Sequence, residues 1–257
     1  MPETIIFIHG LMGNQRAFKH DVSHLKPKFH CITYDLLGHG EQKGQDAAFT
    51  LEALTEQLLC VYEQHHLEKA HLCSLSVGCY ISTYFAAHYS DKVQTLCFIG
   101  GHYNNTSPLF ETLEEYYRLV HEMEYNDWLK RYSSAIFPGH FLNPFSTLSE
   151  QIYYKLGLEI HPQIIKEALR FRLQHDLKAQ LKTLVHPVLW VMGKHDTLYK
   201  SCLYDMDEVI RNLTYIEIPK AGHAANLFRP GLFGKIYENF LMKHQSIFLK
   251  GTLSAST

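Results

Sequence analysis

The stretch AHLCSLSVGCY, residues 70–80, contains two serines two positions apart, followed by a Val-Gly pair. An apolar run leads into it and a helix-like pattern follows, so it predicts a turn between a strand and a helix. A nucleophilic serine on such a turn needs small residues two positions before and two positions after it. Ser76 has Ser74 and Gly78 at these positions, whereas Ser74 would have the branched Leu72. Ser76 is therefore the candidate nucleophile, but the pattern is common and needs support from the rest of the chain.

The composition is that of an ordinary globular protein. The 257 residues are 46% hydrophobic and 19% charged, which excludes wholesale disorder. Lys and Arg number 24 against 26 Asp and Glu, so there is no basic excess and no nucleic-acid partner is expected. The 18 histidines are interpreted as surface residues, because no HExxH motif or other metal-ligand spacing accompanies them. No metal and no cofactor are expected.

The chain shows no targeting or membrane-spanning pattern. It opens with MPETIIFIHG and enters a strand-like run at once, without the charged segment and cleavage site of a signal peptide. No apolar stretch reaches the roughly 18 residues that a membrane span needs. The six cysteines lie mostly inside apolar runs, which favours reduced, buried thiols over disulfides. We expect a cytoplasmic protein, and the sequence does not indicate its oligomeric state.

Six short apolar runs, rich in β-branched and aromatic residues, recur along the chain. Their length and continuous hydrophobicity are typical of strands buried on both faces of a parallel sheet. The runs are TIIFIH (4–9), FHCITY (29–34), KAHLCS (69–74), VQTLCFIG (93–100), PVLWVMG (187–193) and LTYIEIP (213–219). Segments with helical periodicity separate them, such as residues 51–62 with Thr50 as capping residue. The alternation predicts an α/β fold with a mostly parallel sheet of about six strands and functional residues at their carboxyl ends.

One interval, residues 102–184, breaks this alternation. It contains no convincing strand, is rich in aromatic residues and acidic helical segments, and carries turn signals at Pro138-Gly139 and Asn143-Pro144. We expect a helical cap in which most aromatic residues pack against each other and a minority roof a pocket. The expected divisions are an α/β core at 1–101 and 185–250, the cap or lid at 102–184, and a frayed tail at 251–257.

Two later strand ends carry the partners that a serine nucleophile needs. Asp196 follows the run 187–193, and His223 follows the run 213–219. A serine hydroxyl is a poor nucleophile at neutral pH, so an imidazole must take its proton and a carboxylate must orient that imidazole. Taken singly, Asp196 could begin a turn and His223 could cap a helix. Together with Ser76, in this order and each at a strand end, they predict a catalytic triad.

Backbone donors for an oxyanion hole are also expected. FIHGLMGN (7–14) forms a turn directly after the first strand, and the N–H of Leu11 would point at the oxyanion. The N–H of Val77, next to the nucleophile at a helix N-terminus, would be the second donor.

With these residues in place, the chain resembles the α/β-hydrolase superfamily over essentially its whole length. The matching segments are HGLMGN (9–14), YDLLGHG (34–40), SLSVG (74–78), PVLWVMGKHD (187–196) and AGHAANLFRP (221–230). The resemblance implies an α/β-hydrolase fold of the serine esterase or lipase-like branch, with a helical cap. The chain departs from the family's motif at Ser74, which replaces the first glycine of the elbow.

Several branches of the superfamily are disfavoured by single residues. Epoxide hydrolases and dehalogenases carry an aspartate where this chain has Ser76. Hydroxynitrile lyases carry a lysine where it has Ala224, and menaquinone-pathway synthases usually carry an arginine where it has Cys79-Tyr80. The remaining expectation is a serine carboxylesterase that cleaves small-to-medium, largely uncharged acyl esters through an acyl-enzyme intermediate, since an aromatic cap suits an apolar pocket.

Three alternatives stay open, because the fold does not determine the reaction. One is a ligand-sensing or regulatory protein that acts through a partner, for which the acidic, aromatic segment 111–125 is the only candidate surface. Another is a thioesterase with a basic entrance, and the third is a lactonase or C–C bond hydrolase. The basic entrance would consist of Lys178, Lys182, Arg170 and Arg172, which are interpreted instead as scattered solubilising charges.

Overall fold

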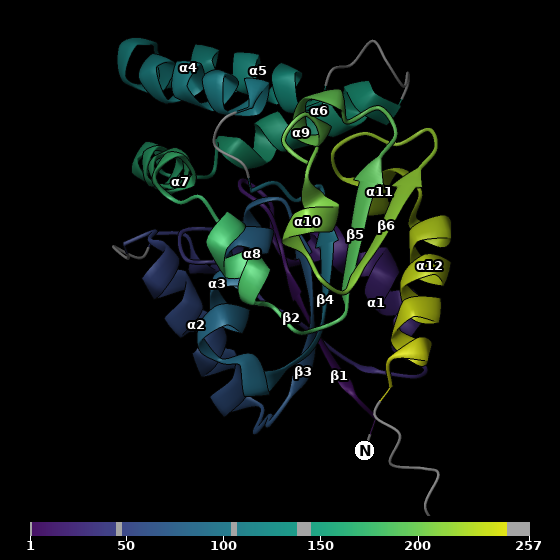
Figure 1. Cartoon of the computed structure of the whole chain (residues 1–257). Coiled ribbons are helices and arrows are strands. Elements are labelled where there is room, and N and C mark those ends of the chain that lie inside the picture. Colours follow the sequence, from purple (N-terminus) through teal and green to yellow (C-terminus); the bar gives the residue numbers. More distant parts are fainter. Residues whose placement is uncertain (1, 45–47, 104–106, 138–144, 246–257) are drawn as a thin grey trace, which may run out of the picture.

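The computed structural model describes residues 2–44, 48–103, 107–137 and 145–245, and its centre is one six-stranded sheet (Figure 1). All neighbouring strands are parallel, in the order β2-β1-β3-β4-β5-β6. The strands are β1 Thr4–Ile8, β2 His30–Thr33, β3 Ala70–Leu75, β4 Val93–Ile99, β5 Val188–Gly193 and β6 Leu213–Ile218. Each predicted strand is present, and the predicted fold class is confirmed.

Helices cover both faces of this sheet, which explains the continuous apolar runs. Every residue of β1, β3 and β5 is buried, whereas the edge strand β6 has exposed positions. One face carries α1 Lys19–Leu25, α11 Ala225–Phe228 and α12 Pro230–Lys243, and the other carries α2 Leu51–Gln64, α3 Val77–His88 and α8 Lys178–Thr183, with α10 Met206–Val209 beside α8 (Figure 1). Thr50 caps α2 as predicted, because its hydroxyl accepts the N–H of Ala53 at 3.2 Å.

Between β4 and β5, the described residues form helices and no strand. The helices are α4 Pro108–Glu122, α5 Tyr125–Ile136, α6 Phe145–Gly157 and α7 Pro162–Gln174, followed by α8. In Figure 1, α4 to α7 lie above the carboxyl ends of the strands. Trp128 stacks on Tyr132 and donates its indole N–H to the carbonyl of Tyr116 at 2.9 Å, so aromatic residues of α4 and α5 pack against each other.

The remaining elements are short. They are the 3₁₀ helices at Gln15–Phe18, Gly40–Gln42 and Ser90–Lys92, and α9 at Thr197–Lys200. The predicted turns at 138–144 and the predicted tail at 251–257 lie outside the described residues, and the division into core and cap stays a prediction. All six cysteines are free thiols, and four of them are buried. Within the described ranges, none of the helices combines the length and apolar character needed to cross a membrane.

Candidate active site

Ser76 lies on the turn between β3 and α3 in a backbone conformation that residues with a side chain seldom adopt. Its φ is 52° and its ψ is −112°. Its N–H donates to the carbonyl of Ile99 and its carbonyl accepts the N–H of Cys79, both at 2.9 Å, so the turn is held from two sides. A Cβ on Gly78 would stand only 2.5 Å from the carbonyl oxygen of Ile8. The close packing of α3 on β1 is therefore the physical reason for the small residue after the serine.

The two serines of the opening motif have different partners. Ser74 is fully buried, and its hydroxyl forms a hydrogen bond with the hydroxyl of Ser82 in α3. Ser76 Oγ lies 2.9 Å from Nε2 of His223. The structure therefore brings Ser76, and not Ser74, to the histidine, in agreement with the sequence-based preference.

Asp196 completes a chain of hydrogen bonds with these two residues. It directly precedes α9 after β5, while His223 lies in the loop between β6 and α11. Oδ2 of Asp196 lies 2.8 Å from Nδ1 of His223, and the side chains of both residues and of Ser76 are buried. With Nδ1–H donating to the carboxylate, Nε2 is left to accept the proton of Ser76 Oγ. This arrangement can deprotonate a serine hydroxyl and stabilise the imidazolium that results.

The two predicted oxyanion donors lie on loops that meet beside the serine. Gly10, next to Leu11, packs so closely that a Cβ on it would stand 3.2 Å from the Cβ of Ser76. Val77 is the first residue of α3, so its N–H has no acceptor within the helix. Within the described part of the chain, the N–H of Leu11 also has no hydrogen-bond acceptor. Both backbone groups are available to a ligand.

Two buried histidines hold the loop that follows β1. Nε2 of His9 accepts the N–H of Leu36 at 2.9 Å, and Nε2 of His39 accepts the N–H of Met12 at 3.1 Å. Burial lowers the pKa of His9 to about 4 and that of His39 to about 3, so both rings are neutral acceptors at pH 7. The interpretation of the histidines as surface residues was therefore wrong at these positions. The sequence did contain a signal for this buried role. A His-Gly pair follows each of the neighbouring strands β1 and β2, at residues 9–10 and 39–40.

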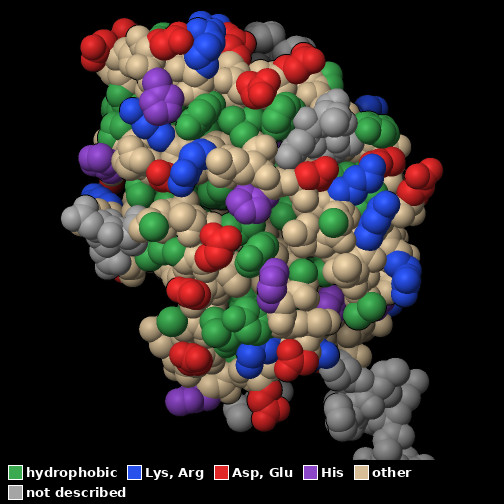
Figure 2. Space-filling model, turned by 60° about the vertical axis from the view of Figure 1, so that its left-hand side comes forward, with side chains coloured by type: hydrophobic (Ala, Val, Ile, Leu, Met, Phe, Trp, Pro, Cys, Tyr) green, Lys and Arg blue, Asp and Glu red, His purple; other side chains and the backbone are tan. Residues whose placement is uncertain are grey.

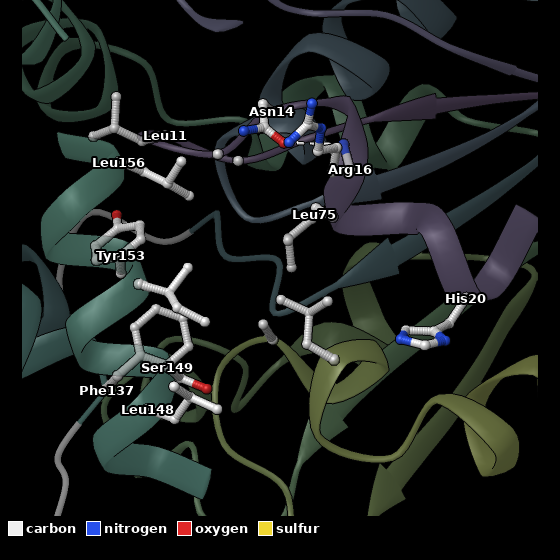
Figure 3. Close-up of a pocket in the computed structure, with 16 residues that line it drawn as sticks. Leu11, Asn14, Arg16, His20, Leu75, Phe137, Leu148, Ser149, Tyr153 and Leu156 are labelled. Carbon is white, nitrogen blue, oxygen red and sulfur yellow. Dashed lines mark hydrogen bonds between the residues drawn. The ribbon is translucent and has the colours of Figure 1, made fainter. Parts of the chain in front are cut away.

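A cavity of about 460 Å³ opens beside the candidate triad (Figure 3). Ser76 and His223 do not line it, but their chain neighbours Leu75 and Ala224 do. In Figure 3, residues of α6 form one wall, facing residues from the loop after β1 and from α1. The lining residues are Gly10, Leu11, Gly13, Asn14, Arg16, Ala17, His20, Leu75, Phe137, Leu148, Ser149, Ile152, Tyr153, Leu156, Ala224 and Leu227. The mostly apolar lining suits a small or medium apolar group.

The aromatic residues of 102–184 divide as predicted. Most described ones pack within the segment, while Phe137 and Tyr153 line the cavity. The ring of Phe137 also lies 6.4 Å from that of His223, between centroids. A minority of these residues therefore does border a pocket near the histidine.

Arg172 differs from its sequence-based interpretation as a solvated charge. It lies in α7 and is 1% exposed. Its guanidinium donates to Nε2 of His102 and to the hydroxyls of Tyr132 and Tyr199. Arg170, two residues earlier, is exposed and pairs with Glu167 on the same helix. The four basic residues named above therefore do not form a common entrance.

Comparison with known proteins places the chain among relatives of similar length. The family model described as alpha/beta hydrolase fold matches residues 3–230. A protein of Bacillus subtilis (strain 168), assigned as 2-succinyl-6-hydroxy-2,4-cyclohexadiene-1-carboxylate synthase, is 24% identical over 93% of this chain and 90% of its own. The 3-oxoadipate enol-lactonase 1 of Acinetobacter baylyi is 21% identical over 94% of this chain and 90% of its own. The solved structure of a hydrolase from Oleispira antarctica has a TM-score of 0.83 at 18% identity, covering 94% of this chain and 92% of that one.

The named reactions of these relatives differ, since one is named as a synthase and the other as a lactonase, so similarity alone assigns no reaction. The family itself follows from the match over most of the chain, together with the parallel sheet and the serine on its strained turn. This chain belongs to the α/β-hydrolase fold family.

Proposed function

We propose that the protein is a serine hydrolase that cleaves carboxylic esters through an acyl-enzyme intermediate. The observation that carries this proposal is the continuous hydrogen-bond chain from Ser76 through His223 to Asp196, with distances of 2.9 and 2.8 Å. A serine that only stabilised the turn would not need a histidine on one side and a buried carboxylate beyond it.

The reaction uses groups of this chain and water. Ser76 Oγ attacks the ester carbonyl while its proton passes to Nε2 of His223, and Asp196 stabilises the imidazolium. The N–H groups of Leu11 and Val77 stabilise the oxyanion of the tetrahedral intermediate. His223 then protonates the leaving alcohol. A water molecule, deprotonated by the same imidazole, attacks the acyl-enzyme and releases the acid.

The cavity supports a substrate with a small-to-medium apolar part. Its volume of about 460 Å³ lies within the roughly 300–1,000 Å³ usual for small-molecule sites. Leu11, which carries one proposed oxyanion donor, and Leu75, which precedes Ser76, both border it, so an apolar group held there would place its ester near Ser76. The enol-lactonase relative is named for cleavage of a lactone, which is a cyclic ester, and this favours lactones as a second substrate class.

The alternatives have less support. The basic entrance expected for a thioesterase would include Arg172, but this residue is buried and cannot contribute to such an entrance. For a protein that acts through a partner, the acidic residues of α4 offer little, because Glu115 pairs with Arg131 and Glu122 pairs with Arg118. On the face shown in Figure 2, acidic, basic and apolar side chains are interspersed, as on an ordinary solvated surface.

The test is the pair of variants Ser76→Ala and Ser74→Ala, assayed with p-nitrophenyl esters of increasing chain length. Ser76→Ala should abolish turnover while its thermal melt stays that of a folded protein, and Ser74→Ala should remain active. A fluorophosphonate should label the wild type at Ser76, as read by intact mass and peptide mapping. Turnover by Ser76→Ala together with an inactive Ser74→Ala would overturn the assignment. If the folded wild type is not labelled, the alternative of a ligand-sensing protein that acts through a partner is favoured.

A further inference from the structure

One feature near the candidate triad has no role in the proposed reaction, namely the buried guanidinium of Arg172. Its Nε and Nη2 donate to Nε2 of His102 at 3.3 and 3.1 Å, respectively. Nη1 donates to the hydroxyl of Tyr132 at 3.1 Å, and Nη2 to the hydroxyl of Tyr199 at 3.3 Å. These contacts tie α7 to α5, to α9 and to the loop after β4, so the group sits where four parts of the chain meet.

The acceptors around this guanidinium are one imidazole and two phenol hydroxyls, and none of them is a carboxylate. Burial and the neighbouring cation hold the pKa of His102 well below its usual range, so this ring is uncharged at pH 7. Burial likewise raises the pKa of the Tyr199 hydroxyl. Among the described residues, no carboxylate lies within ion-pair distance of Arg172. Arginine stays charged in proteins and buried charges are ordinarily paired, so this positive charge lacks an expected anion.

Tyrosines link the guanidinium to the candidate site along two routes. The ring of Tyr199 stacks on that of His223, with centroids 3.8 Å apart, while its hydroxyl accepts from Arg172. On another side, the ring of Tyr132 lies 6.4 Å from that of Tyr153, which lines the apolar cavity. An anion at Arg172 would therefore be separated from the histidine by one tyrosine and from the cavity by two.

An unpaired cation at this place works against the proposed reaction. His223 becomes positively charged when it takes the proton of Ser76, and a nearby uncompensated guanidinium opposes that charge in a poorly solvated site. A substrate that brings its own negative charge removes this opposition. The planar fork of an arginine matches a carboxylate, which can accept two parallel N–H bonds and replace the weaker neutral acceptors.

We propose that Arg172 recognises a carboxylate group of the substrate, so that the substrate class is an ester or lactone with one apolar part and one carboxylate. This inference rests on the proposed function and changes the expectation of a largely uncharged substrate. The apolar part occupies the cavity, and the carboxylate accepts from the guanidinium behind Tyr199 and Tyr132. In the competing account, Arg172 is a structural tie between helices and binds nothing.

The test compares matched substrates that differ only in charge. One pair is the p-nitrophenyl ester of glutaric acid with its second carboxyl free or methylated, and the other is the butyryl ester of glycolate or of methyl glycolate. Wild type should show at least about tenfold higher kcat/KM for the carboxylate member of one pair. Arg172→Gln should lower that ratio by about tenfold to a hundredfold, mainly through KM, and Arg172→Lys should retain part of it. Arg170→Gln, an exposed change on the same helix, should leave the ratio unaltered.

Two results would overturn the inference. One is a wild-type ratio near or below unity for both pairs, and the other is an Arg172→Gln variant that slows both members equally, as a structural tie would. If thermal melting shows that Arg172→Gln does not fold, the wild-type ratio, the Arg172→Lys ratio and competitive inhibition by glutarate against dimethyl glutarate decide the matter. If the protein hydrolyses neutral esters but shows no preference for the charged member of either pair, only the recognition of a carboxylate by Arg172 is refuted. Absence of both turnover and fluorophosphonate labelling refutes the proposed function itself.

Discussion

Replacing Gly78 with alanine should displace Ser76 while leaving the rest of the fold in place. The new Cβ would stand 2.5 Å from the carbonyl oxygen of Ile8 and 3.0 Å from that of His9. Both are backbone atoms of β1 or its end and cannot rotate away. Ordinary van der Waals contact begins at 3.4 Å, so the start of α3 has to move away from β1 by about 0.9 Å, the difference from the shorter distance.

This displacement acts on the residue that must meet both His223 and the ester carbonyl. A misplacement of about 1 Å in an active site costs roughly 10²-fold in rate. Overpacking of a close contact costs about 1–3 kcal/mol of stability, and each kcal/mol lowers Tm by about 2–4 °C for a chain of this size. We therefore expect kcat/KM to fall about a hundredfold in a protein that remains folded.

The assay is kcat/KM for p-nitrophenyl butyrate and the rate of fluorophosphonate labelling of Ser76, with a thermal melt on the same sample. Gly231→Ala is the matched control, because a Cβ at that position, in the first turn of α12, meets nothing within 4 Å. It should match the wild type in all three measurements. If Gly78→Ala labels and turns over within about threefold of the wild type, the turn absorbs a Cβ and the reasoning from the β1 carbonyl is wrong.

Two further predictions concern buried side chains near the site. Burial raises the pKa of Asp21 to about 7 from its ordinary 3.8, so its contribution to stability is full below 3.8 and is lost as the pH rises through 7. Asp21→Asn can keep the 2.9 Å hydrogen bond from Asn226. It should therefore raise the free energy of unfolding by up to about 4 kcal/mol at pH 8 and leave it unchanged at pH 4. Equal shifts of the urea midpoint at the two pH values would contradict this. His39→Leu removes the acceptor of the Met12 N–H and should cost about 1–3 kcal/mol in urea unfolding and lower kcat, because the Leu11 donor is adjacent; an unchanged midpoint would count against it.

The local pattern of the chain was sufficient for the sheet and for the residues at its carboxyl edge. Each strand is a short apolar run between turns, and strands of a parallel sheet end at one edge whatever their separation along the chain. Residues just past three strand ends, Ser76, Asp196 and His223, could therefore be expected together before any distance was known. Hydrogen bonds of 2.9 and 2.8 Å now join them.

Only the tertiary structure decided what surrounds these residues. Arg172 and Arg170 look alike in sequence on one amphipathic helix, yet Arg172 is 1% exposed and Arg170 faces solvent. The reason is that α7 packs against α4, and Arg172 lies on a buried side of the helix, where it contacts His102 in the loop after β4. His39 likewise became a buried acceptor through a contact with Met12, 27 positions away. Burial and charge pairing depend on such long-range contacts, and these contacts produce no periodic pattern of residues in the sequence. The charge of the substrate is therefore a question that the folded chain raises and the sequence pattern does not.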